Sequence, residues 1–195
     1  LEKLVLKWSP RINLVSRADR GNVWQRHIMD SAQIWTYANR EAMKWVDIGS
    51  GGGFPGLVVA ALGAQESPGL VFTLVESDQR KSTFLTEAIR EMAVNAIVCT
   101  DRVEDLEPLG AEVVSARAVA SLDRLLGYYE RHRSPDGVGL FPKGRSVHKE
   151  IVEAQKNWAF EFNVHKSKVE ADAAIIEVGA VSRVTNAEST HSCDS

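Results

Sequence analysis

The stretch Trp45-Val46-Asp47-Ile48-Gly49-Ser50-Gly51-Gly52-Gly53-Phe54-Pro55-Gly56 decides the fold. A short apolar run ends in an acid, and five glycines then fall within eight residues. Glycine is needed where a Cβ would clash or where φ is positive. The pattern therefore predicts a buried strand, a turn whose backbone passes close to a ligand, and the N-terminus of a helix. This combination is typical of nucleotide binding.

Predicted strands alternate with predicted helices on the C-terminal side of this stretch. The strands cover residues 44–48, 70–76, 95–99, 112–116 and 138–141, and the helices cover 55–63, 79–93, 121–132 and 145–157. Such alternation predicts an α/β fold with a mostly parallel, doubly wound sheet. Two more β-rich runs, 158–169 and 173–178, are too close for a crossover helix and predict an antiparallel hairpin. Seven strands ending in a hairpin differ from the six parallel strands of a dinucleotide dehydrogenase domain.

The chain is expected to have three parts. Residues 1–43 read as a helical extension packed on the core, with one helix over 1–8 and a second running to about Asn39. In the second helix Trp24 and Trp35 are 11 residues apart, and we expect both in the core rather than as a platform for stacking bases. Residues 44–184 form the nucleotide-binding domain. Residues 185–195 are polar, and we expect a disordered tail.

Charge is distributed unevenly along the 195 residues. The chain has a net charge of −3, but residues 1–27 alone carry +4, which leaves −7 for the remainder. The four arginines of this arm, Arg11, Arg17, Arg20 and Arg26, are candidate anchors for the phosphates of a nucleic acid. A solvated charged face would give the same pattern.

Composition also bears on location and on metals. No apolar stretch approaches the roughly 20 residues that cross a bilayer, so we expect no membrane association. Cys99 and Cys193 lie far apart, which argues against a disulfide framework or a cysteine metal site. A reducing, cytoplasmic location and the absence of a bound metal are the expectations.

The glycines can be counted in two frames. From Gly51 they satisfy G-x-G-x-x-G, the dinucleotide fingerprint. From Gly49 they read acid-x-G-x-G-x-G, with Asp47 expected at the end of the strand, facing the turn. A carboxylate there would repel a pyrophosphate and attract an ammonium group, such as that of S-adenosylmethionine, so the second frame fits better. The remaining alternative is a loop that only closes a strand–helix corner.

An acid on the next strand supports a nucleoside ligand. Glu76 ends the run Phe72–Glu76 and follows Gly53 by 23 residues, near the ~20 expected for a carboxylate that binds ribose hydroxyls. This carboxylate does not separate NAD from S-adenosylmethionine. Glu76 could instead cap the helix that starts near Asp78.

Several motifs together resemble one family. They are the glycine turn with its Phe54-Pro55-Gly56 extension, Glu76-Ser77 with Arg80-Lys81 and Phe84-Leu85, Arg102-Val103-Glu104, Ser115-Ala116-Arg117-Ala118, Pro142-Lys143-Gly144, Trp8 with Asn13-Leu14, and His27-Ile28-Met29-Asp30-Ser31. Over residues 8–178 the chain is similar to the RsmG (GidB) family, which methylates guanine N7 in bacterial 16S ribosomal RNA. The resemblance implies a Rossmann-like class I fold, S-adenosyl-L-methionine as cofactor, and 16S rRNA or the small ribosomal subunit as partner. We expect a monomer.

Site residues carry over by position. The resemblance implies cofactor contacts at Gly49, Phe54, Val103, Glu104 and Arg117. The glycine spacing and the acids at the two strand ends add Asp47, Gly51 and Glu76. One departure is Glu112, where the family usually has Asp opening the fourth strand.

The implied chemistry needs positioning rather than a general base, because guanine N7 has a lone pair and no proton to lose. Arg102, Arg117 and Lys143 are the candidates to hold guanine O6 and nearby phosphates. An ion pair at a strand end is the alternative for Arg117, and a solvated loop lysine is the alternative for Lys143. His27 and Asp30 share a helix face, and we expect a structural hydrogen bond there rather than a metal or catalytic pair.

Two other functions stay open at this point. The first is an NAD-dependent oxidoreductase that uses the alternative glycine frame, although the chain offers no convincing Tyr-x-x-x-Lys or His–acid pair for it. The second is a non-enzymatic module that senses the cofactor or binds RNA.

Overall fold

The computed structural model describes residues 1–184, so the expected disordered tail at 185–195 lies outside the described residues. A single sheet of seven strands has the order β3-β2-β1-β4-β5-β7-β6. The strands are β1 (Lys44–Ile48), β2 (Val71–Val75), β3 (Ala96–Cys99), β4 (Ala111–Ala116), β5 (Arg133–Lys143), β6 (Trp158–Lys166) and β7 (Ala174–Arg183). Strands β1 to β5 are parallel, whereas β7 is antiparallel to β5 and β6. The predicted α/β fold with a C-terminal hairpin is confirmed.

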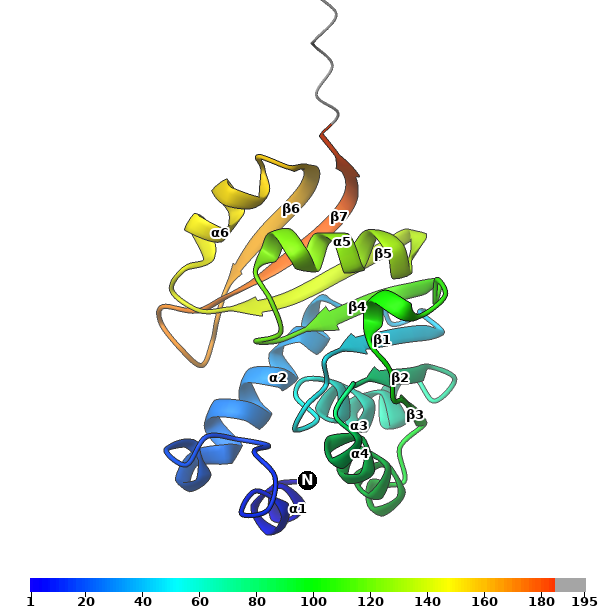
Figure 1. Ribbon diagram of the computed structural model, residues 1–195, viewed down its shortest axis with the longest axis vertical. Helices are drawn as coiled ribbons and strands as arrows, with labels where there is room; N and C mark the ends of the chain where they lie inside the picture. The colour runs from blue at the N-terminus through cyan, green and yellow to red at the C-terminus, as the bar shows by residue number, and fades with distance from the viewer. Residues whose placement is uncertain (185–195) are drawn as a thin grey trace, which may run out of the picture.

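Helices cover both faces of this sheet (Figure 1). The longer helices are α3 (Gly56–Glu66), α4 (Gln79–Met92), α5 (Leu122–His132) and α6 (Val147–Ala154), and a short turn, η4, spans Val103–Asp105. Helices α3 and α4 lie on one face with the N-terminal helices, and α5 and α6 lie on the other. Within β1 the side chains alternate, so Trp45 belongs to the first core and Val46 to the second. This alternation directs Asp47 toward the α3 face.

The N-terminal residues form a succession of short helices rather than one regular helix. They are α1 (Glu2–Trp8), η1 (Asp19–Asn22), the π-helical η2 (Trp24–Met29), α2 (Asp30–Ala32) and η3 (Gln33–Tyr37). The predicted helix over 1–8 is confirmed, and the second predicted segment is helical over residues 19–37, but a π turn interrupts its regular period. A π turn holds more residues than an α turn and rotates everything that follows.

That rotation separates the two tryptophans expected on one face. Trp35 is 4% exposed and stacks on Trp45, with 5.9 Å between the ring centroids. Trp24 is 56% exposed. The core assignment is therefore confirmed for Trp35 and wrong for Trp24.

Strand β4 carries its C-terminal residues to the site in the expected register. Glu112 accepts hydrogen bonds from the backbone N–H groups of Met43 and Lys44, at 2.6 and 3.0 Å. The pairing of β1 with β4 then runs regularly to Asp47 opposite Ser115. The substitution of Glu for the family's Asp thus leaves Arg117 directly after the strand.

No helix within residues 1–184 is both long and apolar enough to cross a membrane.

Candidate active site

The glycine turn is held in a conformation that few other residues adopt. Gly49, Gly51 and Gly53 have φ values of +65°, +52° and +83°, which L side chains rarely adopt. A Cβ on Gly49 would lie 2.5 Å from Cγ2 of Val119, in the loop between β4 and α5. A side chain at Gly49 would therefore clash with Val119, which packs directly against the turn.

Glu76 ties the end of β2 to the turn. Its carboxylate is buried and accepts hydrogen bonds from the backbone N–H groups of Gly51, at 2.9 Å, and Asp78, at 2.8 Å. Asp78, not Glu76, is the cap of α4, since its carboxylate accepts from the N–H groups of Arg80 and Lys81. The capping alternative for Glu76 is therefore wrong.

A cavity of about 190 Å³, here called the turn cavity, opens at the carboxyl ends of β1, β2 and β3. Four predicted cofactor residues line it, namely Gly49, Glu76, Val103 and Glu104. Gly51 adjoins it through its hydrogen bond to Glu76. The positive φ values of the turn and the buried Glu76 carboxylate fit a bound nucleoside with a free ribose diol.

Two residues of α5 complete the turn cavity and escaped the sequence analysis. Arg124 Nη2 and the Tyr128 hydroxyl donate to Glu104 Oε1, at 2.7 and 2.6 Å. The Tyr128 hydrogen bond, with help from Arg124, lowers the pKa of Glu104 to about 2. Their i,i+4 spacing puts both on one helix face, but only the packing of α5 shows that this face meets Glu104.

Asp47 does not join the residues of the turn cavity. It is fully buried, and its carboxylate accepts from the Ser115 hydroxyl at 2.6 Å and from the Gly56 N–H at 3.1 Å. Burial raises the pKa of Asp47 to about 6, against the effect of these hydrogen bonds. The structure thus places Asp47 beneath the turn, at the N-terminus of α3, and not facing the turn as the sequence suggested.

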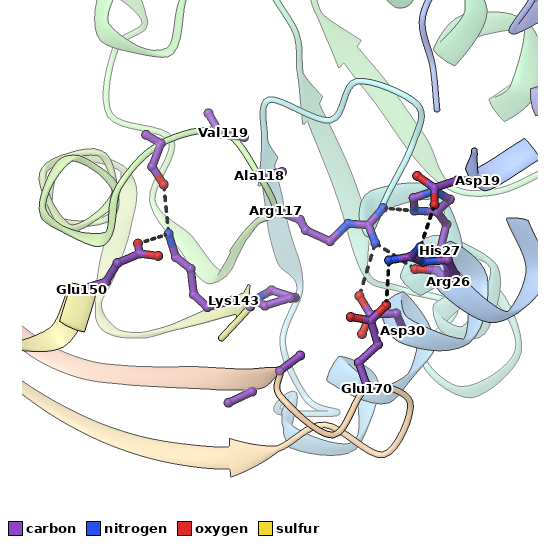
Figure 2. A pocket seen from close by; sticks show the side chains of 15 residues that line it. Asp19, Arg26, His27, Asp30, Arg117, Ala118, Val119, Lys143, Glu150 and Glu170 are labelled. Atoms are coloured by element: carbon purple, nitrogen blue, oxygen red, sulfur yellow. Dashed lines mark hydrogen bonds and ion pairs between the residues drawn. The ribbon is translucent and has the colours of Figure 1, made fainter. Parts of the chain in front are cut away.

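Arg117 lies at the centre of a buried polar network (Figure 2). Its guanidinium donates to the Asp30 carboxylate at 3.2 Å and to His27 Nδ1 at 2.9 Å. The His27 ring stacks on the Phe54 ring with 5.1 Å between centroids, and Arg117 Cζ lies 5.4 Å from the centroid of the Phe54 ring. Neither Phe54 nor Arg117 lines the turn cavity. The contacts of His27 and Asp30 hold Arg117 in place.

The pKa shifts in this network have a common cause. Burial lowers the pKa of His27, and the charge of Arg117 acts in the same direction, so the neutral ring accepts at Nδ1. Burial raises the pKa of Asp30, while Arg117 opposes that shift. The neutral histidine and the paired carboxylate together fix the orientation of the Arg117 fork.

Arg117 and Lys143 line a second cavity of about 470 Å³, here called the arginine cavity. Lys143 Nζ is nearly buried and donates to Glu150 at 2.8 Å and to the Ala120 carbonyl at 2.9 Å. Lys143 is therefore a buried, paired side chain and not a solvated loop lysine (Figure 2). The arginine cavity and the turn cavity share Val119 and Ala120, so the two are neighbours.

Formal charges in the arginine cavity nearly cancel. Three cations line it, Arg26, Arg117 and Lys143, together with four carboxylates, Asp19, Asp30, Glu150 and Glu170. Arg26 itself pairs with Asp19 and with Glu170, at 3.1 and 3.2 Å. With His27 neutral, the lining has a net charge of −1.

The three residues predicted to position a substrate are not all together. Arg102 lines the turn cavity beside Val103 and Glu104, whereas Arg117 and Lys143 line the arginine cavity. Arg102 follows β3, Arg117 follows β4, and Lys143 is the last residue of β5. Strands β4 and β5 are neighbours in the sheet, whereas β2 and β1 separate β3 from them. Within residues 1–184 no group of three or more metal-ligating side chains comes together.

Comparisons with known sequences agree with this geometry. A sequence model of the GidB family, described as rRNA small subunit methyltransferase G, matches residues 1–176. A ribosomal RNA small subunit methyltransferase G from Ruegeria pomeroyi is 48% identical over 181 residues, which cover 93% of this chain and 88% of that protein. The protein of the same name from Paracoccus denitrificans is 44% identical over 176 residues, 90% of this chain and 89% of that protein.

Solved structures share the fold at low sequence identity. The complex of M. jannaschii TYW2 with AdoMet has a TM-score of 0.60 at 16% identity, covering 81% of this chain and 76% of that one. A SAM-dependent methyltransferase from Aquifex aeolicus has a TM-score of 0.61 at 11% identity, covering 85% and 95%. The fold is that of S-adenosylmethionine-dependent methyltransferases.

Proposed function

The chain belongs to the GidB family, rRNA small subunit methyltransferase G, and from this premise we propose that it methylates N7 of a guanine in 16S ribosomal RNA. Family membership makes it a small-subunit rRNA methyltransferase that uses S-adenosylmethionine. One observation carries the proposal: the turn cavity and the arginine cavity adjoin at Val119 and Ala120. A cofactor in the first can thus face a base in the second.

The residues of the turn cavity suit the cofactor. Glu76 offers a fixed carboxylate to the ribose diol, and Gly51, where a Cβ would meet no atom closer than 3.7 Å, allows the cofactor's close approach. Val103 and Glu104, with Arg124 and Tyr128 behind them, would border the adenine end. We assign Asp47 to holding the turn through Gly56, because its carboxylate is fully buried.

Charge in the arginine cavity suits the reaction. When bound, S-adenosylmethionine supplies an electrophilic methyl group, and guanine N7 accepts it with its lone pair, so the base becomes cationic without losing a proton. A lining of net charge −1 tolerates that cation, whereas unpaired cations would oppose it. Arg117 and Lys143, each with its carboxylate partner, orient the base through O6 and nearby phosphates.

The substitution Arg117→Ala tests this assignment. Because Arg117 lies outside the turn cavity, we expect methyl transfer to 16S rRNA to fall by at least 100-fold while S-adenosylhomocysteine affinity stays within about threefold. Transfer of a radiolabelled methyl group to unmodified small subunits, with nucleoside mass spectrometry for 7-methylguanosine, gives the activity, and calorimetry gives the affinity. The control is Arg90→Ala, an exposed arginine of α4. Transfer near the wild-type rate would refute the role of Arg117, and a different modified nucleoside would refute the N7 target.

The relatives are named methyltransferases, so neither the NAD-dependent oxidoreductase nor the non-enzymatic module gains support. Calorimetry with NAD provides a direct check, since binding of NAD in place of S-adenosylhomocysteine would favour the oxidoreductase.

We further propose that the protein acts as a monomer in the cytoplasm. One chain lines both cavities, and the family's substrate is ribosomal. Light scattering of the purified protein measures the oligomeric state.

A further inference from the structure

We propose that a basic notch between the segment after α1 and the first turn of α4 binds a phosphodiester group of the RNA substrate. The notch is a cavity of about 260 Å³ whose cations are Arg11, Arg80 and Lys81. It is separate from the turn cavity and the arginine cavity, with which it shares no lining residue. The inference rests on the proposed rRNA substrate and adds a second point of contact with it.

Two segments far apart in sequence build the notch. Arg11 follows helix α1, where the N–H groups of Arg11 and Ile12 donate to the Trp8 carbonyl at 2.9 and 3.1 Å. Trp8 in turn packs on Phe84 of α4, with ring centroids 5.9 Å apart, and donates to Glu87 at 3.3 Å. Arg80 and Lys81 lie in the first turn of α4. The side chain of Arg11 is thereby brought to the N-terminal end of α4 by a fixed packing contact.

Positive charge in the notch is only partly compensated. Of the residues that the structure describes, Asp78 is the one carboxylate that lines it, and Asp78 is occupied as the cap of α4 and as the partner of Arg80 at 3.2 Å. Among the described residues no acid lies within ion-pair distance of Arg11 or Lys81. Three cations against one carboxylate leave a net charge of +2, in contrast to −1 in the arginine cavity. Such a site attracts a phosphate and not a base that is gaining positive charge.

Its place in the fold connects the notch to the site of methyl transfer. Asp78 follows Glu76 by two residues at the carboxyl end of β2, on the same edge of the sheet as the turn cavity. Strands β2 and β5 are separated by β1 and β4, a span of about 14 Å at three strand spacings of ~4.8 Å. RNA whose target base enters the arginine cavity near β5 can therefore lay a neighbouring phosphate over the notch. S-Adenosylmethionine carries no phosphate, which leaves the RNA backbone as the ligand.

The variants Arg11→Gln, Lys81→Gln and their combination test the proposal. Arg80 stays unchanged because it supports the cap of α4. The matched control is Arg90→Gln, since Arg90 lies on the same helix but at its other end and is 78% exposed. Binding of a naked 16S rRNA transcript is measured across a range of salt concentrations, beside methyl transfer to small subunits and S-adenosylhomocysteine affinity.

We expect each notch substitution to weaken RNA binding about threefold to fivefold near 0.15 M salt and to reduce the slope of log K against log salt by about 0.7 to 0.9. KM for the RNA should rise in parallel, while kcat, cofactor affinity and the Arg90→Gln control stay at wild-type values. Unchanged RNA affinity and salt slope in the double variant would overturn the notch even if the enzyme methylates rRNA. Weaker binding to small subunits but not to naked RNA would also overturn it, in favour of a ribosomal protein contact. If the wild-type protein transfers no methyl group to rRNA but the notch substitutions still weaken its RNA binding, the notch is supported and the proposed reaction is refuted.

Discussion

At the scale of single residues, Asp47 shows how burial changes what a carboxylate does. It lies beneath the turn, where it accepts from the Ser115 hydroxyl and the Gly56 N–H. Burial raises its pKa to about 6 from the ordinary value of 3.8. A raised pKa means that the folded protein prefers the protonated acid, so the contribution of Asp47 to stability is fully present below about pH 4 and falls as the pH rises toward 6.

This shift leads to a prediction for Asp47→Asn, which cannot ionise. A difference of 2.2 between the two pKa values corresponds to about 3 kcal/mol. We therefore expect the wild type to lose about 3 kcal/mol of unfolding free energy relative to the variant between pH 4 and pH 7. Urea unfolding of both proteins at several pH values measures this difference, because the other titrating groups are common to both. Parallel pH profiles would show that Asp47 does not titrate in this range.

At the scale of elements, the π turn η2 sets the faces of the N-terminal segment. It brings His27 and Asp30 to Arg117, while Trp24 of the same turn remains exposed. π turns often occur at functional sites, because the extra residue redirects side chains. Here the redirected side chains complete one wall of the arginine cavity.

The two tryptophans of this segment should differ in their effects on stability. Trp35→Ala removes a buried ring from its stack on Trp45 and should cost about 3–5 kcal/mol of unfolding free energy. Trp24→Ala removes a ring that is mostly exposed and should cost less than about 1 kcal/mol. Chemical denaturation of the two variants measures both values. Similar losses at both positions would contradict the rotation that the π turn imposes.

At the scale of the whole molecule, residues 1–43 are part of the core of the protein. Val5, Ile12, Val23, Ile34 and Trp35 are buried in one cluster with helices α3 and α4. The same segment supplies His27 and Asp30 to the arginine cavity and Arg11 to the basic notch. The division into an extension and a methyltransferase domain, at residue 44, stays a prediction that truncation can test.

A chain that starts at Lys44 should not fold on its own. Five buried apolar side chains, at about 1.5–3 kcal/mol each, amount to roughly 8–15 kcal/mol, as much as the whole stability of a typical domain. We expect the truncated protein to lack a cooperative thermal transition and to bind no S-adenosylhomocysteine. Circular dichroism and calorimetry check both points. A truncated chain that unfolds cooperatively and binds the ligand with wild-type affinity would show that the segment is an accessory unit.

The sequence alone determined the succession of strands and helices along the chain, the C-terminal hairpin and the position of the glycine turn. These features follow from local patterns, since periodicity and glycine spacing act within a few residues and parallel strands end at a common edge. The resemblance to the RsmG family, and no local pattern, implied Val103 and Glu104, whereas glycine spacing and the strand end indicated Gly49 and Glu76, which line the turn cavity with them.

Only the tertiary structure decided which side chains meet. It turned Asp47 under α3, separated Arg102 from Arg117 and Lys143, and exposed Trp24. It also joined Arg11 to the first turn of α4. Each of these outcomes depends on strand alternation, on one π turn or on packing between distant segments. A pattern of neighbouring residues does not contain that information, because the contacts form between parts of the chain that are far apart in sequence.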